Sequence, residues 1–138
     1  TIVNVNVRKL RDHCLRSIHV TQYGGDKSYD YYDLVTQLEK LAFQFSYMTE
    51  YASENRPSSP LFIKLVHLLG KLYKSYLKKD LQNSSQLWEE IEQAKKPMRK
   101  TTELTKRITK CPSAIVVYNY SILRQYSHIA SRIVSLYS

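Results

Sequence analysis

Residues 60–78, PLFIKLVHLLGKLYKSYLK, form the most apolar stretch of the sequence and decide the expected fold. Its apolar residues recur every three or four positions, which is the spacing of one face of an α-helix. These residues are Leu61, Leu65, Leu68, Leu69, Leu72, Tyr73 and Tyr76. Ser59 and Pro60 supply a helix N-cap followed by proline at the first helical position. We therefore expect a long helix here, at the centre of a helical bundle.

Two further helices are predicted before this stretch. Helical spacing runs through residues 2–22 and stops at Gly24-Gly25. The second helix begins at Asp26 or Ser28 and ends before Arg56-Pro57. Acidic residues in its first turns complement the positive end of the helix dipole.

Two more helices are predicted after it. The polar residues 83–85 should break the chain and cap a fourth helix. Its apolar positions keep the same phase from residue 87 to residue 108, so we expect one helix that is kinked at Pro97. Residues 111–113 should end that helix, and a fifth should begin at Ala114.

Length and composition agree with an all-α fold of five long antiparallel helices joined by short connections. The chain has 138 residues but only 3 Gly and 4 Pro, too few for the frequent turns of a sandwich or barrel.

No segment approaches the roughly 20 apolar residues of a membrane span, and we expect a cytoplasmic protein. We interpret Cys14 and Cys111 as small buried apolar residues, although a disulfide between them stays open.

The formal net charge of +9 is unevenly distributed along the chain. Residues 25–56 are net acidic, whereas the segments on either side are basic. The second half of the fourth helix is the candidate surface for a partner or an anion. Its cations are Lys95, Lys96, Arg99, Lys100, Lys106, Arg107 and Lys110. We interpret this face as solvated or as a protein contact rather than a nucleic-acid surface, because no recognition motif accompanies it.

No arrangement of residues indicates catalysis or a cofactor. The four histidines form no zinc motif, and no serine lies in a nucleophile elbow. Cys14 directly follows His13, which on a helix places the two side chains about 100° apart rather than facing each other. We therefore expect no enzymatic activity.

Residues 34–50, LVTQLEKLAFQFSYMTE, resemble the closing helix of a PhoU repeat, with Leu38-Glu39-Lys40-Leu41-Ala42 on the Leu-Glu-Arg-Ile-Gly-Asp core of that motif. The segments LFIKLVHLLGKLYKSYLKKD and SSQLWEEIEQAKK are similar to the two opening helices of a second repeat. The segment SILRQYSHIASRIVSLYS is similar to its closing helix. The resemblance implies one domain of two repeats, with residues 1–56 as a partial first repeat and residues 60–138 as a complete second one. The first helix of the first repeat would then be missing, and since the sequence starts at Thr1, we expect a fragment of a longer chain.

The resemblance also implies acidic pairs four residues apart on the closing helices, which hold clusters of iron or zinc in the family. Here the matching positions are Glu39 with Phe43 and Arg124 with His128. Only Glu39 is acidic, so we expect no metal cluster. His128 is a weak single candidate, which we interpret as a hydrogen-bonded structural residue.

The function that the resemblance implies is regulation of phosphate uptake and homeostasis through protein contacts. The partner would be the ATPase of a phosphate transporter, a sensor kinase, or a fused DNA-binding domain that regulates transcription. A homodimer stays open. The alternatives are a basic nucleic-acid-binding subunit that uses the Lys95–Lys110 face, and a helical adaptor with no connection to phosphate.

Overall fold

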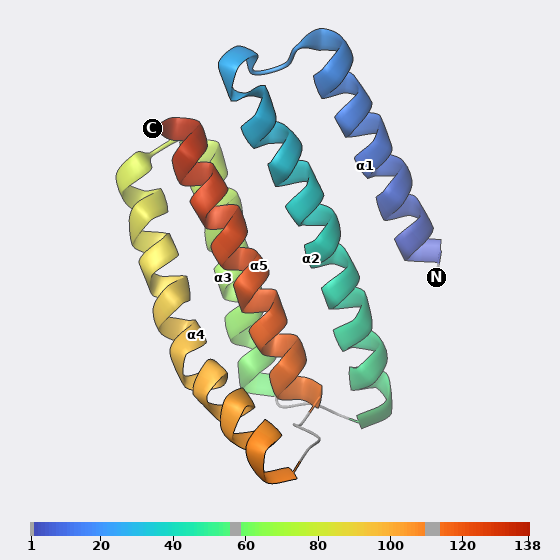
Figure 1. The fold of residues 1–138 in the computed structure, drawn as a ribbon, viewed down its shortest axis with the longest axis vertical. Coiled ribbons are helices and arrows are strands. Elements are labelled where there is room, and N and C mark those ends of the chain that lie inside the picture. The colour runs from blue at the N-terminus through green and yellow to red at the C-terminus, as the bar shows by residue number, and fades with distance from the viewer. Residues whose placement is uncertain (1, 56–58, 110–113) are drawn as a thin grey trace.

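The computed structural model describes residues 2–55, 59–109 and 114–138. It contains five α-helices and one short 3-10 turn, η1. The elements are α1 (Ile2–Thr21), η1 (Gly25–Lys27), α2 (Ser28–Asn55), α3 (Ser59–Lys78), α4 (Leu81–Thr109) and α5 (Ala114–Tyr137). Successive helices run antiparallel (Figure 1). The prediction of an all-α fold with five long helices is confirmed.

The connection between α1 and α2 depends on glycine. Gly24 has a φ of 85° and Gly25 a φ of 57°, in the left-handed region that favours glycine. A Cβ atom on Gly24 would lie 2.6 Å from a ring carbon of Tyr31. The carbonyl of Gly24 accepts a hydrogen bond of 2.9 Å from the backbone N–H of Lys27, which closes the turn. The predicted stop after the first helix is therefore confirmed.

The junction between α3 and α4 lies earlier than the polar residues 83–85 suggested. Asp80 caps α4, because its carboxylate accepts a 3.0 Å hydrogen bond from the backbone N–H of Gln82. Ser84 is buried inside the helix, and its hydroxyl lies 2.6 Å from that of Ser75 on α3. The predicted break at residues 83–85 is wrong, since these residues belong to α4 and Ser84 joins it to α3.

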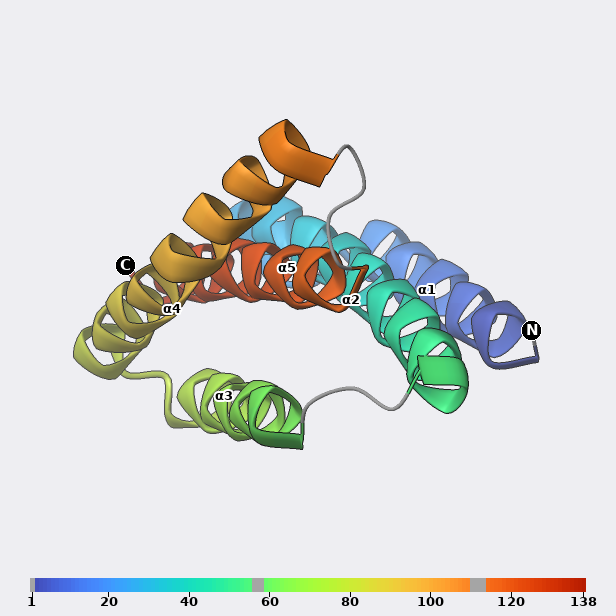
Figure 2. The same cartoon turned by 90° about the horizontal axis from the view of Figure 1, so that it is seen from below.

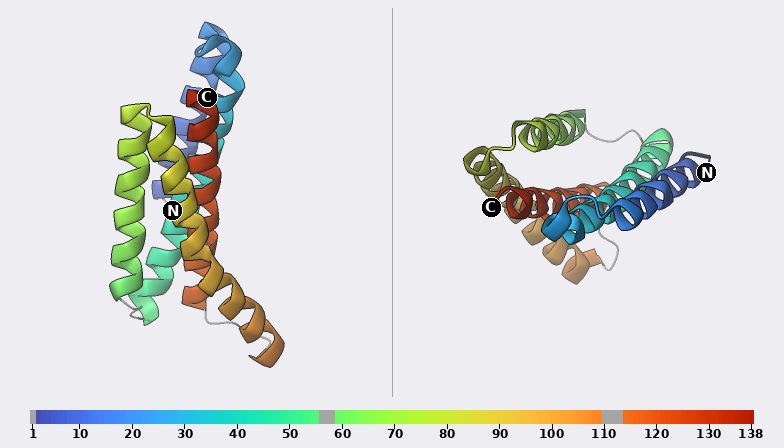
Figure 3. Two further views of the ribbon diagram at one scale, coloured as in Figure 1. Left: turned by 90° about the vertical axis from the view of Figure 1, so that its left-hand side faces the viewer. Right: turned by 90° about the horizontal axis from the view of Figure 1, so that it is seen from above.

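Helix α4 continues through Pro97, as predicted. Its C-terminal half turns away from the other helices, which is clearest in the left view of Figure 3. A proline inside a helix removes one backbone hydrogen bond and favours such a bend.

Helix α5, and not α3, lies at the centre of the fold. It packs against α2, α3 and α4, whereas α1 packs on α2 at the edge (Figures 1 and 2). Helices α2 and α3 both pack on α5, but they are not a closely packed pair themselves. Figure 2 shows α3 standing apart from α2. The prediction that α3 is central is therefore wrong.

The core is built from the faces of α2 to α5 that turn toward one another. Its largest fully buried apolar members are Leu65, Leu68, Ile91, Ile122, Leu123, Tyr126 and Ile133. Tyr126 donates a hydrogen bond of 2.8 Å from its hydroxyl to the carbonyl of Leu65, which joins α5 to α3. Among the described side chains, α1 contributes none to this core. Within the same described residues, no helix combines the length and apolar composition that crossing a membrane requires.

Candidate functional site

Glu39, the one acidic residue at the positions where the sequence resemblance implied metal-binding pairs, is a structural residue that ties α1 to α2. Its side chain is only 9% exposed, and both carboxylate oxygens lie 2.7 to 2.8 Å from the guanidinium of Arg11. Arg11 also donates a hydrogen bond to Asp12. Its hydrogen bonds to Asp12 and to Glu39 raise the pKa of the Arg11 guanidinium. The negative charge of Glu39 is therefore neutralised within the chain.

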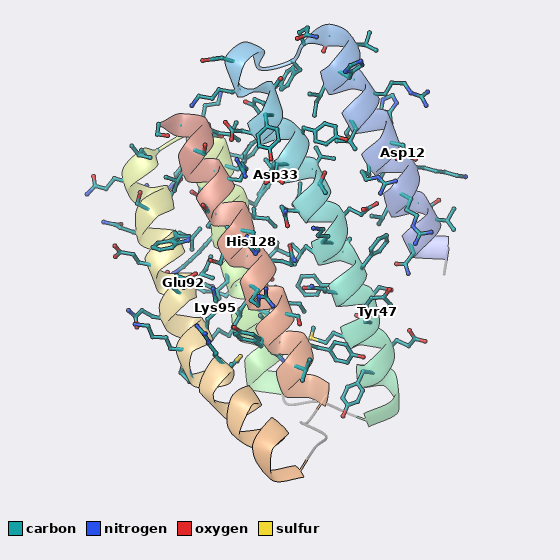
Figure 4. All side chains as sticks on the ribbon, viewed as in Figure 1. Asp12, Asp33, Tyr47, Glu92, Lys95 and His128 are labelled. Carbon is teal, nitrogen blue, oxygen red and sulfur yellow. The ribbon has the colours of Figure 1, made fainter. Side chains whose placement is uncertain are left out.

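The second position of the expected metal motif lies on α5. His128 is exposed and makes no hydrogen bond among the described residues, so its expected hydrogen-bonded role stays a prediction (Figure 4). Arg124 lies one turn earlier, with its guanidinium 6.0 Å from the centre of the Tyr120 ring. In the described ranges, no three His, Cys, Asp or Glu residues are grouped so that they could hold a metal ion.

The basic face of α4 begins with an internal ion pair. Lys95 lies 2.8 Å from Glu92, which also accepts a hydrogen bond from Ser127 on α5 (Figure 4). These two hydrogen bonds lower the pKa of Glu92. Lys95 is therefore paired within α4, and Glu92 joins α4 to α5 through Ser127.

The other cations of this face follow along α4. Lys96 and Arg99 are exposed. Lys100, Lys106 and Arg107 lie on the later turns of the helix, and Lys110 lies outside the described residues. The described part of the chain therefore places two exposed cations on this face.

The structure adds a site that the sequence reasoning missed, an apolar cavity of about 340 Å³ between α2 and α3. Helix α5 forms its floor. The lining residues are Tyr31, Leu34, Val35, Leu38, Leu69, Leu72, Tyr73, Tyr76, Ile129 and Ile133. None of these side chains is charged.

A second cavity, of about 220 Å³, lies between α1 and α2. Its lining residues are Val7, Leu10, Arg11, Cys14, Val35, Leu38 and Glu39. The two cavities share Val35 and Leu38, and we call the surface that they form together the apolar valley.

Cys14 is exposed with a free thiol, so the prediction that it is buried is wrong; Cys111 lies outside the described residues.

Helix α3 presents two neighbouring apolar rows rather than one. The first row packs on the core and contains Leu65, Leu68 and Leu72. The second row is exposed and contains Val66, Leu69, Tyr73 and Leu77. Tyr73 is 64% exposed although it lines the valley. In the sequence, the apolar residues of α3 cover a wider arc of the helix than packing against one neighbouring helix requires. This width is the signal that indicates the second row.

Cations lie on another part of the surface of α3. Lys71, Lys74 and Lys78 line a cavity of about 250 Å³ between α3 and α4. Lys71 pairs with Glu90 at 2.9 Å, whereas Lys74 and Lys78 have no ion-pair partner among the described residues. The side of α3 that faces α4 therefore carries two lysines without an ion-pair partner among the described residues.

Comparison with known proteins found no protein-family model, no curated protein and no solved structure that matches the chain.

Proposed function

We propose that the chain is a non-enzymatic regulatory domain that works by binding a protein partner in the apolar valley. The observation that carries the proposal is the pair of cavities that meet at Val35 and Leu38. A contiguous exposed apolar surface costs free energy in water and is typical of a surface that another molecule covers. Leu38, at the junction of the two cavities, is 45% exposed.

The carboxylates near the core support a binding role rather than a catalytic one. Asp30 and Asp33 both pair with Arg132 at 2.8 Å, which holds α2 against α5. Glu39 and Glu92 are paired in the same way, as described above. Each of these carboxylates is bonded to a cation of the chain.

A PhoU-type arrangement would make α2 and α5 the two closing helices, with α3 and α4 as the opening helices of the second repeat. The direct packing of α2 on α5 supports this assignment, because it would join the two repeats through their closing helices. The role in phosphate homeostasis is inferred from the sequence resemblance. On that reading, the valley would bind the ATPase of a phosphate transporter or a sensor kinase.

Site-specific photo-crosslinking in the cells that make the protein would test the proposal. A photoreactive phenylalanine analogue replaces Tyr73, in the valley, or Tyr47, which lies outside it and is 49% exposed. Nine residues separate positions 38 and 47, so Tyr47 lies on the opposite side of α2 from Leu38. We expect one specific protein to crosslink at position 73, not at position 47, and not after the additional change Leu38→Glu.

The outcomes of this experiment are distinct. A transporter ATPase or sensor kinase at position 73 would support the phosphate role, whereas an unrelated protein would favour a general adaptor. Equal crosslinking at both positions, or none at position 73, would contradict binding in the valley. A mobility-shift assay at about 50 mM salt tests the nucleic-acid alternative, which requires an affinity that falls steeply as salt rises.

A further inference from the structure

We infer that the cavity between α3 and α4 binds a small anion with two linked phosphate groups, a diphosphate-type ligand. This cavity has a volume of about 250 Å³, and none of its lining residues lines the apolar valley. The anion site is therefore separate from the protein contact proposed above. Three features of the cavity indicate it: an excess of cations, free amides opposite them, and the repetition of both after one helical turn.

The lining of the cavity is largely polar and comes from two antiparallel helices (Figure 1). Helix α3 supplies residues spaced i, i+3, i+4 and i+7 on one helix face, namely Lys71, Lys74, Ser75 and Lys78. Helix α4 supplies residues with the same spacing, namely Asn83, Gln86, Leu87 and Glu90. Each helix therefore presents two turns of side chains to the cavity.

The cations of the cavity outnumber its carboxylates. Glu90 is the one carboxylate among the lining residues, and it pairs with Lys71 at 2.9 Å. Lys74 and Lys78 are exposed and have no ion-pair partner among the described residues. The nearby carboxylate of Asp80 is already engaged, because it accepts a hydrogen bond from a backbone N–H of α4. An anion can therefore approach two ammonium groups without breaking an ion pair of the chain.

The α4 side of the cavity offers hydrogen-bond donors. The side-chain amides of Asn83 and Gln86 are exposed and make no hydrogen bond among the described residues. Each amide can donate to an oxyanion, as an ammonium group does. Ser75 is buried and cannot donate, because Ser84 gives its own proton to the carbonyl of residue 80 and accepts that of Ser75. The lysines and the amides would therefore hold the anion.

The register of the two helices places an amide opposite each free lysine. The ion pair between the first lysine and Glu90 fixes this register at one end of the cavity. Because the helices run antiparallel, the next turn of α3 places Lys74 opposite Gln86. The turn after that places Lys78 opposite Asn83. The same lysine–amide pair is thus repeated after a rise of about 6 Å.

Two lysine–amide pairs one turn apart match two linked anionic groups. A single phosphate or sulfate that fills one pair leaves the other cation without a partner, whereas a diphosphate engages both. An ammonium group has three donors and binds phosphate oxygens as a compact charge. A nucleic-acid strand would instead need cations distributed along many phosphates, and the cavity confines its cations to two turns of α3. The geometry therefore favours a small ligand.

Isothermal titration calorimetry of the full chain with sodium diphosphate tests this site. At about 50 mM salt we expect saturable binding with a Kd below about 1 mM, which weakens as salt rises. Inorganic phosphate and sulfate should each bind at least about tenfold more weakly, because each engages one lysine–amide pair. In nuclear magnetic resonance spectra, the amide shifts that diphosphate causes should be largest at residues 71–78 and 83–90.

Matched variants separate the site from a general effect of charge. Lys74→Gln combined with Lys78→Gln should weaken diphosphate binding at least about tenfold. The control combines Lys9→Gln with Lys40→Gln, which removes the same charge from exposed positions on α1 and α2 and should change the affinity less than about twofold. Glu90→Gln should strengthen binding by several fold, because it removes the one carboxylate of the cavity and frees its third lysine. All five side chains are exposed, so these variants should fold, which circular dichroism verifies.

Each contrary result has a definite meaning. Equal weakening in the two double variants would show that net charge alone attracts the anion, and the site would be wrong. Phosphate or sulfate binding as tightly as diphosphate would overturn the two-group ligand. An unchanged or weaker affinity in Glu90→Gln would contradict the assigned position of the anion. Without saturable binding at about 10 mM diphosphate, the cavity would not be an anion site at all. Crosslinking in the apolar valley does not depend on any of these results.

Discussion

The hydroxyl of Tyr126 should hold α3 in place, and the variant Tyr126→Phe tests this. The side chain is fully buried on α5, and its hydroxyl donates to the carbonyl of Leu65 at 2.8 Å. Burial raises the pKa of Tyr126, so the hydroxyl keeps its proton and remains a donor at physiological pH.

The expected loss follows from what the substitution removes. The ring stays buried, so the cost of about 3–5 kcal/mol for deleting an aromatic side chain does not apply. One intramolecular hydrogen bond is lost, which contributes about 0.5–1.5 kcal/mol to the free energy of unfolding. We therefore expect Tyr126→Phe to lower that free energy by about 1 kcal/mol.

Urea unfolding followed by circular dichroism measures this change. With a slope of about 1–3 kcal/mol per molar urea, the midpoint should fall by roughly 0.3–1 M. Tyr118→Phe is the matched control, because Tyr118 lies on the same helix and is half-buried, and its hydroxyl makes no hydrogen bond among the described residues. Amide hydrogen exchange should also accelerate in α3. An unchanged midpoint, or an equal fall in the Tyr118→Phe control, would refute the proposed attachment.

Three other substitutions test particular contacts by thermal or urea unfolding. Arg11→Met leaves the buried carboxylate of Glu39 unpaired and should cost about 1–3 kcal/mol. The double variant with Glu39→Gln should recover part of this loss, and no recovery would contradict the pairing. For Asp30, burial alone would raise the pKa, but hydrogen bonds from Arg132 and Ser135 outweigh it and lower the pKa. Its stabilisation is therefore fully present above about pH 4, the ordinary value, and is lost as pH falls through the lowered pKa of the folded state. Asp30→Asn should flatten the acid side of the stability profile, and an unchanged profile would refute the assignment. Gly24→Ala should cost about 1–3 kcal/mol, because φ is 85° and the new Cβ would meet Tyr31 at 2.6 Å. A neutral result there would contradict the turn geometry.

The local structure of the chain could be predicted from its sequence, because helix periodicity and capping are short-range properties. Gly24-Gly25 ended the first helix, and the constant phase across Pro97 predicted one continuous helix. The error at residues 83–85 has a physical cause. Ser84 has the composition of a cap, but its hydroxyl partner Ser75 is on another helix, which no local pattern reveals.

The arrangement of the helices, and with it the candidate site, could not be predicted in the same way. An apolar face shows that a helix needs a partner but does not identify that partner. The apolar residues of α3 suggested a central helix, whereas one row packs on α5 and the other lines the valley. Cys14 is exposed for a related reason, since within the described residues α1 packs mainly against α2 and buries one side.

The dependence of α1 and α2 on a single distant helix has a consequence for how the chain folds. Helices α3, α4 and α5 are consecutive and pack on one another, so their contacts close short loops, whereas α2 reaches α5 across the whole length of α3 and α4. Closing that long loop is entropically costly and slow. We therefore expect α3, α4 and α5 to assemble first and the α1–α2 hairpin to dock as a unit in the last step. Because α2 forms one wall of the valley, the binding surface would be completed only when folding is.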